Sequence, residues 1–391
     1  MRIAMLVHNR IHFGTFQRAH SLARHLVRLG HELTICAGAA QCGRPPRYAT
    51  LDGVTIVEPF DPLPIRFREG GLSPFDVLNR LHYLLRRPCD LIHCFDHRPS
   101  VSLPGLLLAR LRKIPSVIDW ADLWGFEGIA SERSSLMGAS LGAFDTVLET
   151  AVRRKADALT VISTALQRRA QGRFPAPVHL LPVGANSDLI KPISKAEARG
   201  RLGFPENASI AVHTGLAPYD AEFLAQSFLQ LVKLQPGALL VTTGRRFPAL
   251  DRAIFSAGLT SQFTHLGMLG RDALPQVFAC ADALLLPYTD RSVNRFRYPN
   301  KLGDYLAAGR PIVTNRTGDL GQLVAEERVG LLADDTPEAF ASSIKQLFDD
   351  AALRDELGRR ARLLAESKLD WGFLAAGLER FYLETIARVR R

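Results

Sequence analysis

The chain has 391 residues, enough for two or three domains of roughly 150 residues each, and its 47% hydrophobic and 23% charged residues exclude a disordered protein. No apolar run approaches the roughly 20 residues that cross a bilayer, and the apolar stretch 1–7 is too short for a signal peptide, so we expect a cytoplasmic protein. The net charge of +10 is concentrated in residues 1–185, where 23 basic and 15 acidic residues give +8; the remainder has 26 basic and 24 acidic residues, which give +2. The basic half predicts a phosphorylated substrate or an acidic membrane surface as partner. Nucleic acid is disfavoured because no binding module accompanies the charge.

The first half alternates between short apolar runs and helical patterns. Residues 2–7 form an apolar run typical of a buried parallel strand, and from Gly14 apolar residues recur at helical spacing up to Gly30, where the helix ends. This predicts a strand–helix–strand unit with a right-handed connection. The remaining predicted strands are 32–37, 54–57, 91–94, 116–119, 159–162 and 178–181, and the remaining predicted helices are 74–87, 101–112, 143–156 and 164–172.

A second alternating series follows the Pro- and Gly-containing stretch 182–192, which we interpret as a hinge. We therefore predict an α/β protein with two Rossmann-like parallel-sheet domains facing across a cleft, in which ligands bind beyond the carboxyl ends of the strands. The predicted domains are 1–183, 184–370 and a C-terminal helix, 371–391, that crosses back to the first domain. The predicted strands of the second series are 209–213, 238–242, 264–266, 283–286 and 311–314.

The five cysteines are an odd number in a large chain, which makes a disulfide framework improbable. Cys89, His93, Cys94 and His97 lie close together, but their spacing lacks a Cys-x-x-Cys pair. We therefore expect neither a metal nor any other cofactor.

Three loops of the first half follow predicted strands and carry polar residues. Gly14 and Thr15 begin the first helix, where one glycine either lets a phosphate or sugar hydroxyl approach the backbone or simply serves a tight turn. The glycine-rich fingerprint of dinucleotide binding is missing, which disfavours a nicotinamide dehydrogenase. The second loop carries Asp96, His97 and Arg98, and the third carries Asp119, Trp120, Asp122 and Trp124.

These last two loops are a candidate site for catalysis or substrate binding. Acid, imidazole and guanidinium groups together are costly to bury unless they are used or ion-paired. Carboxylates among indoles favour a raised pKa, proton transfer and sugar binding, while the alternative is a tryptophan core with Asp122 as a helix cap. We take His97, Asp119 and Asp122 as candidate catalytic residues. Thr15, Asp96, Arg98, Trp120 and Trp124 are candidate substrate-binding residues, and the family resemblance given below implies that this substrate is the acceptor.

The strongest signal is the stretch 298–313. A helix beginning near Pro299 directs its first N–H groups toward the cleft, and Lys301 in its first turn opposes the helix dipole unless an anion binds there. Helix amides and a lysine together suit a diphosphate, and Asp304 one turn later is placed to accept both hydroxyls of a ribose. Arg291, Arg295 and Arg297 precede the helix in a cationic loop, and Asn300 and Leu302 flank the lysine.

This stretch resembles the donor-nucleotide motif of family 4 glycosyltransferases and their relatives with the GT-B fold. Residues 180–186 resemble the hinge motif of the family, 281–287 resemble the strand before the donor loop, and 265–269, with Met268 and Leu269, resemble the loop that contacts the base. The final helix also fits the family's return to the first domain, so the resemblance covers most of the chain. It implies a donor site that also includes Gly215, the glycine that opens the second domain.

The sequence departs from the family pattern at three places. Many members have two glutamates in this stretch. Asp304 occupies the position of the second glutamate, and Phe296 occupies the position of the first. The segment 215–220 lacks the usual Arg and Lys that grip the diphosphate, a role that Arg245, Arg246, Arg295 or Lys301 would take over. Ala121 replaces a frequent histidine.

The resemblance implies a glycosyltransferase that moves a sugar from a UDP- or GDP-sugar to an acceptor hydroxyl, with retention at the anomeric carbon and without a metal. The acceptor is a sugar, a glycolipid or a small molecule, with cell-envelope polysaccharide or glycolipid synthesis as the expected context. If the enzyme inverts, Asp122 is the candidate base and Asp119 the second. The alternatives are a nucleotide-sugar 2-epimerase of the same fold and a non-catalytic subunit that binds sugar nucleotides.

The predicted helix 74–87 is amphipathic and basic. Its apolar face is accompanied by Arg80, Arg86 and Arg87, and Arg66 and Arg68 precede it. Such a helix suits either an anionic membrane surface, on the inner face of the membrane, or packing on its own sheet.

Overall fold

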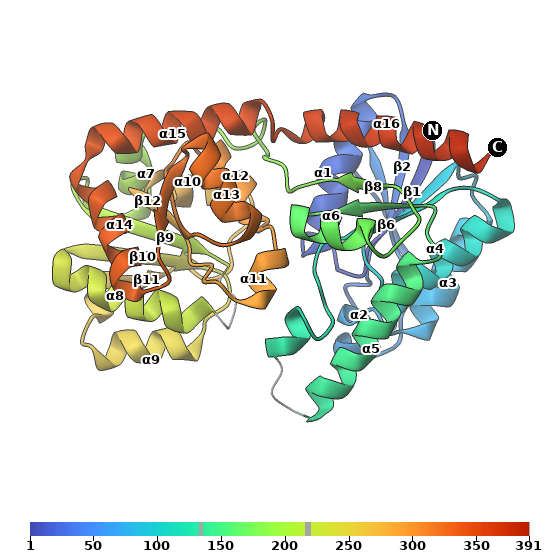
Figure 1. The fold of residues 1–391 in the computed structure, drawn as a ribbon, viewed down its shortest axis with the longest axis horizontal. Helices are drawn as coiled ribbons and strands as arrows, with labels where there is room; N and C mark the ends of the chain where they lie inside the picture. Colours follow the sequence, from blue (N-terminus) through green and yellow to red (C-terminus); the bar gives the residue numbers. More distant parts are fainter. Residues whose placement is uncertain (133–135, 216–219, 391) are drawn as a thin grey trace. The chain divides into compact units, whose positions relative to one another are not determined.

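A computed structural model describes residues 1–132, 136–215 and 220–390 (Figure 1). The chain folds into two compact units, of which the first comprises Met1–Val183 and Trp371–Arg391 and the second Gly184–Asp370. Each unit is an α/β domain built on its own sheet, as the alternating sequence pattern predicts. Within the described residues, no helix is both long and apolar enough to cross a membrane.

In its described residues, the first unit has an eight-stranded sheet of order β3-β4-β2-β1-β5-β6-β7-β8. All its pairings are parallel except β3 with β4. The sequence analysis missed β3, an exposed edge strand with no apolar run, although its hairpin turn of Asp52 and Gly53, both at positive φ, is a known signal. The strands are β1 Arg2–Leu6, β2 Glu32–Cys36, β3 Arg47–Leu51, β4 Val54–Glu58, β5 Leu91–Cys94, β6 Ser116–Trp120, β7 Ala158–Val161 and β8 Val178–Leu180.

The helices of the first unit cover this sheet, and α1 packs against the C-terminal helix α16. The face of α1 that carries Ala19, Leu22 and Leu26 is fully buried, as its spacing predicts. Helix α5 begins at Leu136, seven residues before the predicted start. The helices are α1 Thr15–Arg28, α2 Ile65–Glu69, α3 Pro74–Leu85, α4 Pro99–Arg112, the 3-10 turn Ile129–Glu132, α5 Leu136–Arg153, α6 Thr164–Gln171 and α16 Trp371–Val389.

Two of the arginines in and before the predicted basic helix, Arg68 and Arg80, are buried. Arg68 donates to the backbone carbonyl of Leu63 at 2.9 Å and to that of Ala39. Arg80 pairs with Asp76 at 2.6 Å and donates to a carbonyl at the end of β1. Both guanidinium groups satisfy buried backbone oxygens, so their charges do not contribute to a surface.

The second unit, in its described part, has a six-stranded parallel sheet of order β11-β10-β9-β12-β13-β14. Its core joins α8 and α14 to one face of the sheet, with Phe228, Leu240 and Ile344 at its centre. The strands are β9 Ser209–Thr214, β10 Ala238–Thr243, β11 Phe263–His265, β12 Ala283–Leu286, β13 Ile312–Asn315 and β14 Gly330–Ala333; the helices are α7 Lys195–Leu202, α8 Ala221–Leu234, α9 Pro248–Ser256, the 3-10 turn Thr260–Gln262, α10 Leu274–Ala279, α11 Ser292–Phe296, α12 Lys301–Ala307, α13 Gly318–Glu327, α14 Pro337–Asp349 and α15 Ala351–Glu366.

Candidate active site

The carboxyl edge of the second sheet is formed by close glycine turns. Gly215 follows β9 and Gly244 follows β10, both with positive φ, and the backbone N–H of Gly244 donates to the carbonyl of Gly267 at 2.8 Å. Lys301, the first residue of α12, reaches this edge and donates from Nζ to the carbonyl of Gly215. A lysine from α12 and the turn after β9 therefore meet at one place, as the parallel topology requires.

The electrostatic surroundings of Lys301 favour an anion. Burial, reinforced by the neighbouring Arg297 charge, lowers the pKa of Lys301 to about 7 although Asp220 opposes the shift. Arg297 stacks on Tyr288, with its guanidinium carbon 4.9 Å from the ring centre, and lies 3.8 Å from Asp220. Burial raises the pKa of Asp220 to about 6, so this carboxylate is mostly ionised at pH 7 and interacts with both cations. Lys301 and Arg297 therefore place two cationic side chains beside one carboxylate.

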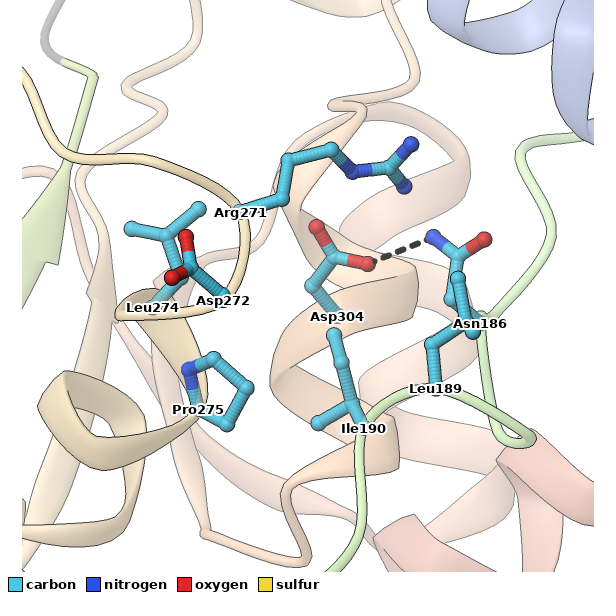
Figure 2. A pocket seen from close by; sticks show the side chains of 8 residues that line it. All are labelled: Asn186, Leu189, Ile190, Arg271, Asp272, Leu274, Pro275 and Asp304. Atoms are coloured by element: carbon cyan, nitrogen blue, oxygen red, sulfur yellow. Dashed lines mark hydrogen bonds between the residues drawn. The ribbon is translucent and has the colours of Figure 1, made fainter. Parts of the chain in front are cut away.

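One turn along α12, Asp304 opens onto a cavity of about 270 Å³. Figure 2 shows its carboxylate beside Asn186, whose amide Nδ2 donates to Oδ1 at 2.9 Å. Among the described residues none donates to Oδ2, and the pKa of Asp304 is raised by burial. Arg271 extends over the same cavity, where its charge partly offsets the raised pKa of Asp304, but it makes no hydrogen bond or ion pair with any described residue. The cavity thus offers one carboxylate oxygen and one guanidinium to a ligand, above a wall of Leu189, Ile190, Leu274 and Pro275.

The other predicted donor residues fall into an exposed set and a buried one. Leu302, the second residue of α12, is fully buried and does not face solvent. Arg295 is held in a two-point pair with Asp290 at 2.6 and 2.7 Å. The predicted segment 215–220 lies partly outside the described residues, since 216–219 are among those not described. Exposed at or near the carboxyl edge are Arg245, Arg246, Met268 and Asn300, whereas Leu269 is partly buried.

In the first unit, the glycine at the start of α1 has a structural explanation. Asn9 accepts hydrogen bonds at Oδ1 from both the backbone N–H and the hydroxyl of Thr15, each at 2.7 Å. Gly14 lies between them with φ of +47°, and a Cβ there would collide with the Asn9 side chain. This turn therefore requires glycine, and Asn9 caps the helix.

The loop after β5 gathers a buried ionic cluster. Asp96 lies 2.7 Å from Nδ1 of His97 and 3.2 Å from Nδ1 of His8, and Asp145 of α5 lies 2.7 Å from Arg98. Burial would lower the pKa of His97, but the carboxylates of Asp96 and Asp145 outweigh it and raise the pKa, whereas burial lowers the pKa of His8 to about 4. The cluster therefore favours the protonated form of His97 and the neutral form of His8.

Trp124 connects this cluster to the loop after β6. The Arg98 guanidinium stacks on the Trp124 ring, with its carbon 4.2 Å from the ring centre. Trp124 and Asp122, two residues apart in the same loop, are each partly exposed. A cation on an aromatic face with a carboxylate nearby is a surface that suits a sugar hydroxyl and its apolar ring face.

Two of the predicted residues of this loop lie in the interior instead. Asp119 is fully buried and pairs with Arg18 at 3.1 Å, and it accepts a hydrogen bond from Thr160 at 2.5 Å. Trp120 is also buried, and its indole N–H donates to Glu149 at 3.1 Å. The structure therefore brings His97, Arg98 and Trp124 together and places Asp119 and Trp120 beneath them.

Sequence reasoning missed several residues of these sites. His213 lies under Lys301, donates from Nδ1 to the carbonyl of Leu285 at 2.8 Å, and has a pKa well below its ordinary value because of burial. Asp220, Arg271 and the Asn186 amide were also missed as site residues. Arg271 had one signal, since it is the first cation after the predicted base-contacting loop. Among the described residues, no group of three or more His, Cys, Asp and Glu side chains is arranged to hold a metal ion.

Comparisons with known proteins agree with this geometry. A glycosyl transferase 4-like domain model matches residues 13–184, and a glycosyl transferases group 1 model matches residues 209–350. A D-inositol 3-phosphate glycosyltransferase of Kineococcus radiotolerans is 25% identical over 93% of this chain and 89% of its own. A GDP-mannose-dependent alpha-(1-6)-phosphatidylinositol monomannoside mannosyltransferase of Mycobacterium tuberculosis is 25% identical over 73% of this chain and 82% of its own.

Solved structures show the same fold. Sucrose-phosphate synthase from Thermosynechococcus elongatus matches 99% of this chain and 100% of its own, with a TM-score of 0.82 and 18% identity. Anabaena Alr3699/HepE in complex with UDP-glucose matches 99% of this chain and 100% of its own, with a TM-score of 0.73 and 16% identity. The two family models follow one another along the chain in the order of its two units. The chain therefore belongs to the glycosyltransferases of the GT-B fold, with a glycosyl transferase 4-like first domain and a glycosyl transferases group 1 second domain.

Proposed function

We propose that the second unit binds a nucleotide-diphosphate sugar with its diphosphate against Lys301 and Arg297. The observation that carries this proposal is the partly buried lysine beside an arginine, with the single carboxylate of Asp220 near both. A diphosphate adds negative charge beside the two cations and accepts charge-assisted hydrogen bonds from both. The same cations stabilise the charge that develops on the diphosphate when the bond to the sugar breaks.

The cavity beside Asp304 is our proposed site for the nucleoside part of the donor. Asn186 orients the Asp304 carboxylate and leaves Oδ2 for ribose hydroxyls, and Arg271 lies opposite. The side chain of Asp304 is one methylene group shorter than that of the glutamate that the family pattern has here, so the ribose would lie closer to α12. Relatives and neighbours carry both GDP and UDP in their names, and we retain both as candidate donors.

We propose that the first unit presents the acceptor hydroxyl to the donor. The loop with His97, Arg98 and Trp124 is the surface that supports this assignment, with Asp122 beside it. The family resemblance implies retention at the anomeric carbon, and Asp122 is the candidate base if the reaction inverts. The names of the relatives favour an inositol phosphate or a phosphatidylinositol glycolipid as acceptor class.

A donor screen followed by turnover tests the proposal. Thermal unfolding is measured with UDP, GDP, ADP, CDP, TDP and their common sugars; a ligand at 100 times its Kd stabilises by about 2.7 kcal/mol. The selected donor is then incubated with inositol phosphates and phosphatidylinositol, and products are identified by mass spectrometry. Glycosylated acceptor supports the transferase, an isomerised donor without acceptor indicates the 2-epimerase, and binding without turnover indicates a non-catalytic subunit.

We further propose that α3 and α4 dock the enzyme on an anionic membrane surface, in keeping with the expected place on the inner face. These helices pack together, and each exposes a row of leucines: Leu78 and Leu85 on α3, and Leu103, Leu107 and Leu111 on α4. Leu78 is 64% and Leu111 60% exposed, which is unusual for leucines in a well-packed domain. Exposed basic residues flank the rows, namely Arg86, Arg87, Arg110 and Lys113. An apolar stripe with cationic borders is the pattern of an interfacial membrane surface.

Sedimentation with vesicles tests this surface. Arg86→Ser with Arg87→Ser is expected to reduce binding to phosphatidylglycerol-containing vesicles by about thirtyfold, at roughly 1 kcal/mol per basic residue. Arg201→Ser with Arg252→Ser, two exposed arginines of the second unit, is the control with the same loss of charge. Equal binding by the two double variants would contradict the proposal.

A further inference from the structure

A second cavity lies at the opposite edge of the second sheet, where the strands begin. Asp282 immediately precedes β12 and Pro311 immediately precedes β13, and both line a cavity of about 580 Å³. Since the strands are parallel, this amino edge is separated by the sheet from the glycine turns at the carboxyl edge. The cavity is therefore distinct from the proposed donor site, and its volume is typical of small-molecule sites.

The charged groups of this amino-edge cavity are unbalanced. Five cationic and two acidic side chains line it, a difference of +3. Three of the cations have carboxylate partners, since Lys195 and Arg354 lie 2.7 and 3.6 Å from Asp282, and Arg362 lies 2.7 Å from Glu366. The remaining two cations are Arg310 and Arg359.

Arg310 is held by backbone carbonyls only. Its guanidinium donates to the carbonyl of Ile193 at 2.9 Å and to that of Ala279 at 3.0 Å, which fixes its position without neutralising its charge. Within the described chain, no carboxylate lies at ion-pair distance from it; burial lowers its pKa, and the more distant charges of Asp282 and Asp355 oppose that shift. A partly buried guanidinium that contacts no carboxylate gains from a bound anion.

Arg359, on α15, is the second uncompensated cation. Its side chain is exposed at the cavity, and the structure gives it no hydrogen bond or ion pair with any described residue. Arg310 is thus preorganised and Arg359 is free to close on a ligand, while Pro192, Ile193 and Pro311 supply apolar wall. Two guanidinium groups, each with several N–H donors, suit the several oxygens of a phosphate.

We propose that the amino-edge cavity binds a phosphorylated small molecule, with its phosphate against Arg310 and Arg359 and its body against the apolar wall. The volume is large for a single phosphate ion and matches a phosphorylated sugar or nucleotide. This site is independent of the donor assignment, because it shares no lining residue with the cavity of Asp304.

Pyrophosphate is the probe, titrated calorimetrically into the full chain. Because pyrophosphate would also bind beside Lys301, the titration is made in a Lys301→Met background, where one site is expected to remain. Adding Arg359→Glu should weaken that site at least tenfold. Arg360→Glu, the neighbouring surface arginine that lies outside the cavity, is the matched control and should change the affinity by less than twofold. Circular dichroism melting checks that both variants fold.

Hydrogen exchange locates the bound pyrophosphate independently of the titration. Pyrophosphate should slow exchange in peptides that cover residues 306–312 and 354–362 in the Lys301→Met background, and Arg359→Glu should abolish this protection. Three results would each overturn the proposal: no pyrophosphate binding in the Lys301→Met background, equal effects of the two charge reversals, or protection confined to other peptides.

Discussion

Lys301 makes donor binding depend on pH in a predictable direction. Its pKa is lowered to about 7 in the unliganded protein, mainly by burial, and a diphosphate at its ammonium group would favour the charged form. Binding at pH above 7 must therefore take up a proton. Because only about a tenth of a group with pKa 7 is protonated at pH 8, affinity should fall roughly tenfold between pH 6 and pH 8.

The assay is calorimetric titration of UDP and GDP at pH 6, 7 and 8, with wild type and Lys301→Met in parallel. Titration of the ligand's own phosphate affects both proteins equally. The ratio of the wild-type affinity to the variant affinity therefore reports the contribution of Lys301 alone. At pH 6 the charged hydrogen bond is worth about 2 kcal/mol, or roughly thirtyfold in Kd. This ratio should shrink to a few-fold at pH 8. A ratio that is constant with pH would refute the reasoning, and a ratio near one at every pH would place the diphosphate elsewhere.

Three further predictions follow from single contacts. Asp304→Ala should weaken nucleotide binding by roughly tenfold to a hundredfold through loss of hydrogen bonds to a charged acceptor, measured by calorimetry, with unchanged melting as the control; unaltered affinity would contradict the ribose assignment. Arg18→Met should cost about 3–5 kcal/mol in denaturant unfolding because it leaves Asp119 buried with an uncompensated charge, and a loss below 1 kcal/mol would show that the ion pair is dispensable. Gly303→Ala should destabilise by about 1–3 kcal/mol because its Cβ would meet a backbone carbonyl, whereas Gly200→Ala, in a helix with open space around it, should not; equal effects would argue against close packing at α12.

The sequence predicts the sheet strands best where they are apolar and central. Strand β1 and helix α1 follow directly from their periodicity, and the carboxyl-edge loops follow from the parallel topology. Strands β3 and β14 have no such signal, because both lie at a sheet edge, where β3 is mostly exposed and β14 is only partly buried. The early start of α5 was missed because its first residues lack a distinct apolar stripe.

The candidate site could be predicted only where one segment carries it. Lys301 and Asp304 belong to a single motif and were found from the sequence, but Asn186 meets Asp304 across 118 residues. Asp119 shows the opposite difficulty, because a carboxylate at a strand end has the same sequence signature whether it faces solvent or, as here, pairs with Arg18 from α1. Such pairings depend on tertiary packing, which residue types and spacing do not encode locally.

A buried polar chain explains why so many charged and hydroxyl groups lie inside the first unit. Tyr382 of α16 lies 2.6 Å from His93, His93 lies 3.1 Å from Thr160, and Thr160 donates to Asp119, which pairs with Arg18. Arg18 in turn donates to the carbonyls of residues 181 and 182, just before Val183, where the chain leaves the first unit. An apolar core would stabilise the unit at least as well, whereas hydrogen bonds have direction and fix the positions of their partners. The network therefore fixes, within one unit, both the point where the chain leaves it and the helix with which the chain returns.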